Sequence, residues 1–349
     1  MVDQSLQRGI TDEFVAQLQP GGILFPLLQR VQNDDTLSLE IRNGYVDIYY
    51  RGGRLLGVHA QAKATRFSTQ FDERYFGDDA AYRVSRPTPP NTTIKCERDA
   101  QAWVEAFAAY KQAMDVRFSL HPKIEREYQQ AVVRDNNRHS TGELSDYVVI
   151  DVEYVQSAYA IPGQRTETGY RFDMVGFRWP VAGGSRANSK VTPVIMEMKA
   201  GDGAITSSRK GEKPDDLSPG LVKHVLDFER FLTPEPGEKI SKPFDLLRKE
   251  LAEMFETKKR LDLPSLPKGM KKRLTITKAD VSDRPEVLFV LANHQPSSQR
   301  LKNELNELAK LKLPLGEHAD YGVATVSFAG YALFADKVIP LEAFIAQLT

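Results

Sequence analysis

The chain has 349 residues, enough for one large domain with an appendage or for two domains. Charged residues make up 27% and apolar residues 41%, the balance of a globular protein with a sizeable core. Lysine plus arginine and aspartate plus glutamate both number 47, which excludes a global attraction to nucleic acid and leaves only local ones. The single cysteine, Cys96, excludes an intrachain disulfide and a thiolate zinc cluster. No secretory signal or membrane-spanning run is visible, so we expect a cytoplasmic protein without a membrane partner.

The first part of the chain has the pattern of a β-meander. Residues 37–42, 45–51 and 54–60 read as three antiparallel strands, joined by Asn43-Gly44 and Gly52-Gly53 turns. Residues 85–91, with three prolines, then read as a linker or a rigid loop. We therefore predict an N-terminal antiparallel β-rich module over residues 1–95 and a second domain over residues 96–349.

The second part alternates helices and strands. We expect two helices separated by a break at His121-Pro122, and their inward residues are Trp103, Phe107, Tyr110 and Met114 in the first and Ile124, Tyr128, Ala131 and Val132 in the second. Strands at 147–155, 170–177 and 194–200 follow, with a polar loop at 183–190 before the last. Ser218-Pro219 then predicts a helix start, followed by a strand at 286–293, a helix at 298–311 and a strand or hairpin within 322–334. This order indicates an α/β protein with a mixed central sheet flanked by helices.

The strand at 194–200 carries two charges inside an apolar run. Because side chains alternate along a strand, Glu197 and Lys199 share one face and Met196 and Met198 share the other. Charges at such positions are costly unless something requires them. The preceding strand adds Asp173, and an aspartate next to Glu-x-Lys suits a hard divalent cation and a phosphate.

Two alternatives stay open for these charges. Glu197 and Lys199 could form an ordinary ion pair, with Asp173 an unrelated residue at a strand end. Asp151 and Glu153 form a second carboxylate pair on an earlier strand, but no lysine follows them, so Asp173 ranks first. Sequential strands are usually neighbours, and we therefore predict that Asp173 rather than Asp151 pairs with Glu197.

Asp173, then Glu197-Met198-Lys199, preceded by a helix with Glu125-Arg126-Glu127, resembles the PD-(D/E)xK nuclease superfamily. The resemblance covers about residues 98–293 and implies a restriction-endonuclease-like core. It also implies that Asp173, Glu197 and the backbone carbonyl of Met198 bind a catalytic Mg²⁺ or Mn²⁺ and that Lys199 serves the attacking water. A glutamate of the preceding helix commonly joins such a site; Glu125 is our choice and Glu127 the alternative.

Some features around this motif are ambiguous. In many members the helix after the lysine strand adds a polar residue, and His224 occupies that place here, although a packed histidine fits its position near the apolar stripe. Phe172 stands where the motif has proline. Tyr49, Tyr50, Arg51 and Arg54 at a hairpin tip could stack on bases or simply pack.

The expected function is a metal-dependent nuclease that hydrolyses phosphodiester bonds of nucleic acid; DNA is favoured over RNA as substrate, and the choice between them is left open. The alternative is a catalytically inactive nuclease-fold protein that binds nucleic acid or a protein partner. Positive charge concentrates in a predicted loop whose candidate phosphate contacts are Lys258, Lys259, Arg260, Lys271, Lys272 and Arg273. A solvated charged loop is an equal alternative, and a homodimer is left open.

Overall fold

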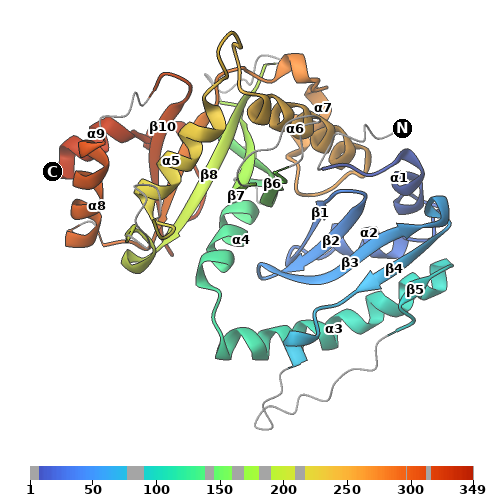
Figure 1. Cartoon of the computed structure of the whole chain (residues 1–349). Helices are drawn as coiled ribbons and strands as arrows, with labels where there is room; N and C mark the ends of the chain where they lie inside the picture. The colour runs from blue at the N-terminus through green and yellow to red at the C-terminus, as the bar shows by residue number, and fades with distance from the viewer. Residues whose placement is uncertain are drawn as a thin grey trace.

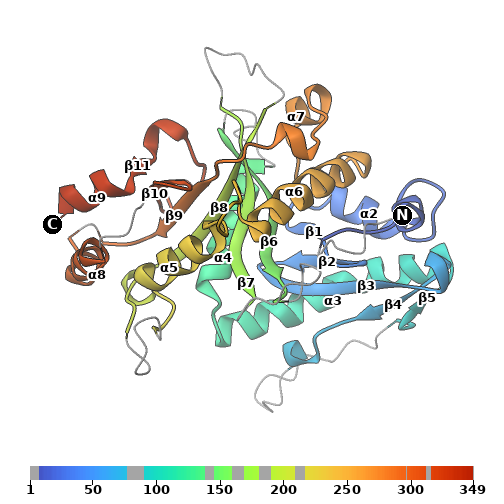
Figure 2. The same cartoon turned by 45° about the horizontal axis from the view of Figure 1, so that its top comes forward.

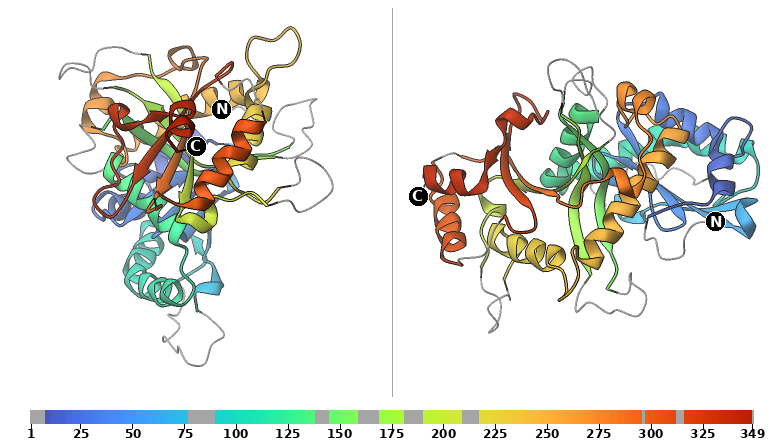
Figure 3. Two further views of the ribbon diagram at one scale, coloured as in Figure 1. Left: turned by 90° about the vertical axis from the view of Figure 1, so that its left-hand side faces the viewer. Right: turned by 90° about the horizontal axis from the view of Figure 1, so that it is seen from above.

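A computed structural model of the chain describes residues 8–76, 90–137, 145–158, 169–180, 190–208, 217–295, 297–311 and 316–348. They form an α/β structure with two sheets (Figure 1). The first sheet lies at one end of the molecule, helices α8 and α9 lie at the other, and the second sheet lies between them, as the view from above also shows (Figure 3). Within these residues, no helix is both long and apolar enough to cross a membrane.

The first sheet is antiparallel throughout and has the strand order β1-β2-β3-β4-β5. Its strands are β1 (Leu37–Ile41), β2 (Tyr45–Tyr50), β3 (Gly53–Gln61), β4 (Arg66–Gln70) and β5 (Thr93–Ile94). The three predicted strands are thus confirmed. The second turn differs by one residue: Tyr50 pairs with Gly53, so Arg51 and Gly52 form the turn, and both have positive φ. Such φ values match the twist of a tight hairpin.

Three helices cover this sheet. They are α1 (Asp12–Leu18), α2 (Phe25–Gln32) and α3 (Glu97–Leu120). The predicted apolar stripe of α3 is confirmed, since Trp103, Phe107, Tyr110 and Met114 are buried. Because α3 packs on α2, β3 and β5, the first layer extends to Leu120. One continuous apolar core joins this layer to the helices of the second sheet. The domain division at residues 95 and 96 stays a prediction.

The second sheet is mixed, as predicted. Its order is β11-β10-β9-β8-β7-β6; β6, β7 and β8 are antiparallel neighbours, whereas β8, β9 and β10 run parallel. The strands are β6 (Tyr147–Gln156), β7 (Tyr170–Arg178), β8 (Thr192–Ala200), β9 (Glu286–Ala292), β10 (Asp320–Val326) and β11 (Ile339–Pro340). Parallel neighbours need long crossover connections, which the helices between β8 and β10 supply.

Helices cover both faces of the second sheet. One face packs on α4 (Ile124–Asn137), and the other packs on α5 (Leu221–Leu232), α6 (Lys242–Arg260), α8 (Gln299–Lys310) and α9 (Leu341–Leu348). The remaining helix is α7 (Lys268–Arg273), and the short 3-10 turns are Ala62–Ala64, Glu73–Phe76, Asp202–Ala204, Lys278–Asp280 and Ala335–Lys337.

Several local expectations need correction or lie outside the described residues. Gly220, not Ser218, caps α5. Ile124 is exposed rather than inward, because it lies in the first turn of α4 and the core contacts of that helix begin further along. The predicted polar loop at 183–190 and linker at 85–91 fall almost entirely outside the described ranges.

Candidate active site

Strand β8 places Glu197 and Lys199 side by side in a buried position. Their exposed fractions are 4% and 3%, and Lys199 Nζ donates to Glu197 Oε1 at 2.8 Å. Met196 and Met198 are buried in the separate core beneath α4. The predicted alternation along the strand is therefore confirmed, and the two charged side chains lie on the face covered by α5.

Asp173 lies where strands β7 and β8 separate. Their pairing ends at Met174 and Met196; beyond that point β7 pairs with β6, and β8 continues along β9. The separation removes the strand partner that the Met198 N–H would otherwise have. Asp173 Oδ2 accepts this N–H at 2.8 Å. A side-chain carboxylate thus replaces a ladder bond and is held next to Glu197.

His224 of α5 completes a triangle of polar atoms with the β8 residues. Its Nε2 is 3.0 Å from both Lys199 Nζ and Glu197 Oε1. Burial alone would raise the pKa of Glu197, but the contacts with His224 and Lys199 outweigh it and hold this pKa below its usual value. Glu197 therefore remains ionised near neutral pH. The sequence left open whether His224 packs or joins the site; it does join this cluster.

The other two carboxyl groups have the opposite electrostatic balance. Burial, with added repulsion from Glu197 and Glu125, raises the pKa of Asp173 well above its usual value. Burial also raises the pKa of Glu125, as does Glu197, although Lys199 and the Ala200 N–H oppose the shift. The region thus has more carboxylates than Lys199 can neutralise. A cation near Asp173 would relieve that imbalance.

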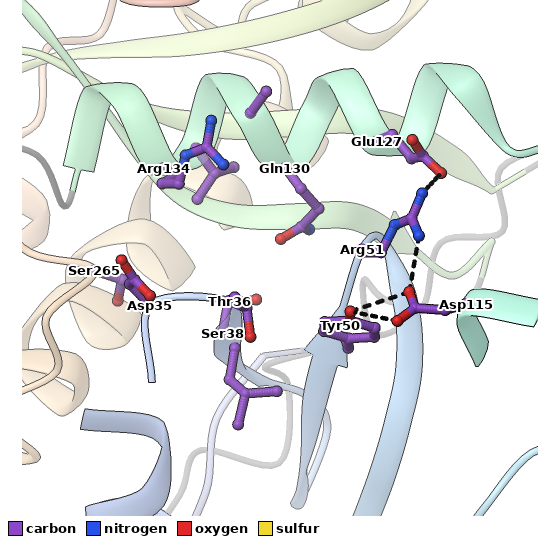
Figure 4. Close-up of a pocket in the computed structure, with 13 residues that line it drawn as sticks. Asp35, Thr36, Ser38, Tyr50, Arg51, Asp115, Glu127, Gln130, Arg134 and Ser265 are labelled. Carbon is purple, nitrogen blue, oxygen red and sulfur yellow. Dashed lines mark hydrogen bonds and ion pairs between the residues drawn. The ribbon is translucent and has the colours of Figure 1, made fainter. Parts of the chain in front are cut away.

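Glu127 belongs to a different part of the molecule. It accepts from Arg51 Nη2 at 2.8 Å, and Arg51 Nη1 binds Asp115 of α3 at the same distance. These residues line a cavity of about 450 Å³ between α4 and the first sheet (Figure 4). Tyr50 also binds Asp115 there, and burial together with that hydrogen bond raises the pKa of Tyr50 to about 12. Of the two α4 glutamates, Glu125 is therefore the one that interacts with Glu197 and Lys199.

Asp151 is likewise engaged elsewhere. It is buried and accepts from Arg8 Nε at 2.7 Å and from Arg42 Nη1. Burial alone would raise its pKa, but the two arginines lower it below its usual value. Glu153 pairs with Arg126 at 3.3 Å. Asp173, and not Asp151, is thus the strand aspartate that interacts with Glu197.

The residues proposed for phosphate contact are not on a loop. Lys258, Lys259 and Arg260 end α6, and Lys271, Lys272 and Arg273 lie in α7. The loop prediction was wrong because the prolines at 264 and 267 separate two helices instead of ending the helical region. Lys258 is buried against Glu40 at 2.8 Å, and Lys272 and Arg273 are exposed.

Most of this basic group is already paired. Lys259 donates to the Leu274 carbonyl, Arg260 pairs with Asp12, and Lys271 pairs with Asp262. The group also lies at the opposite end of β8 from Glu197 and Lys199. Val281, which follows α7 in the chain, bridges Val191 at the start of β8, whereas Glu197 and Lys199 lie near its end. Figure 2 shows α7 far from the first turn of α4.

One contact of the site was not predicted from the sequence. The hydrogen bond from Met198 to Asp173 depends on where two strands part, and no local pattern marks that point. Among the described residues, no three histidine, cysteine, aspartate or glutamate side chains converge tightly enough to enclose a metal by themselves.

Comparison with models of protein families, with curated proteins and with solved structures found no match.

Proposed function

We propose that this protein is a metal-dependent nuclease of the PD-(D/E)xK type. The observation that carries the proposal is the placement of Asp173 next to Glu197 where β7 and β8 part, with Lys199 on the same strand face. Asp173 has a raised pKa and its neighbour Glu197 a lowered one, and perturbed pKa values are often found at functional sites.

The fold around these residues supports the same proposal. The antiparallel strands β6, β7 and β8 are followed by the parallel strands β9 and β10, with helices on both faces. This arrangement is compatible with a restriction-endonuclease-like core. Glu125 enters the site from the helix that precedes the strands, which is the place that the resemblance implies.

The donor set fits a hard cation. Mg²⁺ or Mn²⁺ would be held by the carboxylates of Asp173 and Glu197 and by the Met198 carbonyl, with water in the remaining positions. When bound, such an ion polarises the phosphate and lowers the pKa of a bound water. Asp173 is oriented by the Met198 N–H, so its second oxygen is left for a ligand.

Lys199 and His224 would act on the substrate side of this site. Lys199 holds one oxygen of Glu197 and can orient the attacking water with its other N–H groups. His224 Nε2, 3.0 Å from both groups, can accept or donate a proton at the same point. The buried surroundings strengthen each of these interactions relative to water.

A second candidate function is an inactive member of the same fold that binds nucleic acid or a protein partner. The direct contact of Lys199 with Glu197 is also what an ordinary buried ion pair would show. Asp173 favours the enzyme. Lys199 and His224 lower the pKa of Glu197, whereas among the described residues no cation offsets the raised pKa of Asp173 to the same degree.

Two measurements on the purified protein test the proposal. Crystals soaked in Mn²⁺ should show an anomalous peak between Asp173 and Glu197, and the protein with Mg²⁺ should cleave DNA, with RNA tested in parallel. A peak without cleavage of either polymer would favour the inactive alternative. Neither peak nor cleavage would leave Glu197 and Lys199 as a structural ion pair.

A further inference from the structure

A cleft rich in arginine lies where the first sheet meets the second. Its volume is about 510 Å³, and it is bounded by the β2–β3 hairpin, the 72–75 segment, the first turn of α4 and the end of β6. Five arginines and three carboxylates line it: Arg8, Arg42, Arg54, Arg74, Arg126, Asp47, Asp72 and Glu153. We call this the arginine cleft. Its lining has an excess of positive charge in a protein whose net charge is zero.

The floor of the cleft is held by internal ion pairs. Arg8 and Arg42 are buried and both bind Asp151, which lies behind them in β6. Arg42 also donates to the Val152 carbonyl at 3.0 Å. These two guanidinium groups therefore connect the N-terminal layer to the second sheet.

The rim arginines are differently placed. Arg54 and Arg126 have side chains that are 34% and 48% exposed, and their nearest carboxylates are at 3.9 and 3.3 Å. Arg74 holds Asp72 and is 85% exposed. Long, partly exposed ion pairs contribute little to stability, so Arg54 and Arg126 can turn to a ligand at small cost. Arg74 can do so only by releasing its bidentate pair with Asp72 at 2.6 Å. Their planar forks match a phosphate group.

Aromatic rings lie among these positive charges. Tyr45 lines the cleft and stacks on His59, with ring centroids 4.2 Å apart and planes 17° from parallel. Both rings are half-buried, so the stack is partly open to solvent. Guanidinium groups beside a stacking surface are the combination that binds single-stranded nucleic acid, because bases stack while the backbone is neutralised.

The cleft borders the carboxylate site. Arg126 directly follows Glu125 in the first turn of α4, and Arg126 pairs with Glu153 of β6. Glu153 lies between Val152 and Tyr154, which pair with Met174 and Phe172 on either side of Asp173. Glu153, which lines the cleft, is therefore one strand away from Asp173. The basic residues of α7 have no such connection, because they lie at the opposite end of β8.

We propose that the arginine cleft binds the phosphodiester backbone of a single-stranded nucleic-acid segment that continues into the carboxylate site. This inference rests on the proposed nuclease function and assigns part of its substrate path to the N-terminal layer. Arg54, Arg74 and Arg126 contact phosphates, and the Tyr45–His59 stack supports a base.

The test measures binding without cleavage. A fluorescent single-stranded oligonucleotide of about 12 nucleotides, as DNA and as RNA, is titrated in EDTA at several salt concentrations. We expect Arg54→Ala/Arg74→Ala to weaken binding about fivefold or more at low salt and to reduce the salt slope by about 1.4, since single strands lose about 0.7 per phosphate contact. Arg54→Lys/Arg74→Lys keeps the charges and should retain most of the salt slope.

The matched control removes the same charge elsewhere. Lys272→Ala/Arg273→Ala, on exposed residues of α7, should bind as the unaltered protein does. Equal losses in both double variants, unchanged affinity in the cleft variant, or equal competition by polyglutamate would overturn the inference. Cleft-dependent binding by a protein that never cleaves would support it while overturning the nuclease proposal. Cleavage by the protein, together with unchanged affinity in the cleft variant, would support the nuclease proposal and overturn the inference about the cleft.

Discussion

Two aspartates on neighbouring strands, Asp151 buried and Asp173 half-buried, have opposite surroundings. Asp151 of β6 lies between Arg8 and Arg42, and these cations lower its pKa despite burial. Asp173 of β7 is close to two further carboxyl groups, and burial and repulsion raise its pKa. The charge of an aspartate is thus balanced by neighbouring cations in the Asp151 cluster, which we call the balanced cluster. It is not balanced in the Asp173 cluster on the next strand, which we call the unbalanced cluster. The neighbouring charges decide the direction of the pKa shift at these two aspartates.

The balanced cluster joins the two sheets. Arg8 and Arg42 come from the N-terminal layer and Asp151 from the second sheet, and Glu40 of β1 meets Lys258 of α6 in the same way. Such pairs are costly to break because the remaining charge stays buried. In the unbalanced cluster, the cation of the proposed function would relieve the repulsion between Asp173 and its neighbouring carboxyl groups.

The largest expected effect concerns the charged residues of β8. We expect Glu197→Ala and Lys199→Ala each to abolish Mg²⁺-dependent cleavage while leaving the fold intact, because each removes a group that the proposed function requires. Cleavage is measured on labelled DNA and the fold by circular dichroism. Nuclease activity that survives in purified Lys199→Ala protein would show that the assignment is wrong.

The corresponding change in the balanced cluster should act on stability. Asp151→Asn leaves Arg8 and Arg42 buried without a charged partner, and we expect it to lower the free energy of unfolding by about 3–5 kcal/mol. Urea denaturation measures this. Asp336→Ala breaks an exposed pair with Lys337 and should cause no measurable change. A stability of Asp151→Asn equal to that of the control would refute the structural role.

The two glutamates of α4 offer a matched pair. We expect Glu125→Gln to slow cleavage about tenfold or more, as losses next to metal ligands do, and Glu127→Gln to leave the cleavage rate unchanged. Glu127 is bound to Arg51 at a partly exposed site, so its loss should cost at most about 1 kcal/mol. Equal cleavage rates in the two variants would remove Glu125 from the site.

The smallest effect sharpens the charge argument. A carboxyl with a raised folded pKa favours folding below its unfolded pKa, and this contribution is lost as pH rises through the folded pKa. Asp173→Asn should therefore raise the melting temperature in EDTA by about 2 °C at about pH 8, and by less at about pH 5, where a larger fraction of Asp173 carries a proton. Mg²⁺ should stabilise only the unaltered protein. A lower melting temperature for Asp173→Asn at both pH values would contradict the imbalance.

Local patterns in the sequence determined much of this protein. The strands β1 to β3 and β6 to β9, the stripe of α3 and the helix α8 follow from alternation, helical spacing and turn residues. The shared face of Glu197 and Lys199 follows from strand geometry alone. Such features depend on the backbone of a few consecutive residues, so no distant contact is needed to predict them.

Tertiary structure alone decided which charges have partners. Lys258, which was predicted to contact phosphate, instead donates to Glu40, 218 residues away. Asp151 accepts from Arg42, 109 residues away. Asp173 contacts the Glu197 strand because β7 and β8 part beside it, whereas Asp151 does not. Glu127 faces Arg51 and not the Glu197 cluster, because it lies on another side of α4 than Glu125. A pKa depends on every charge within a few ångströms, and folding brings those charges from distant parts of the chain.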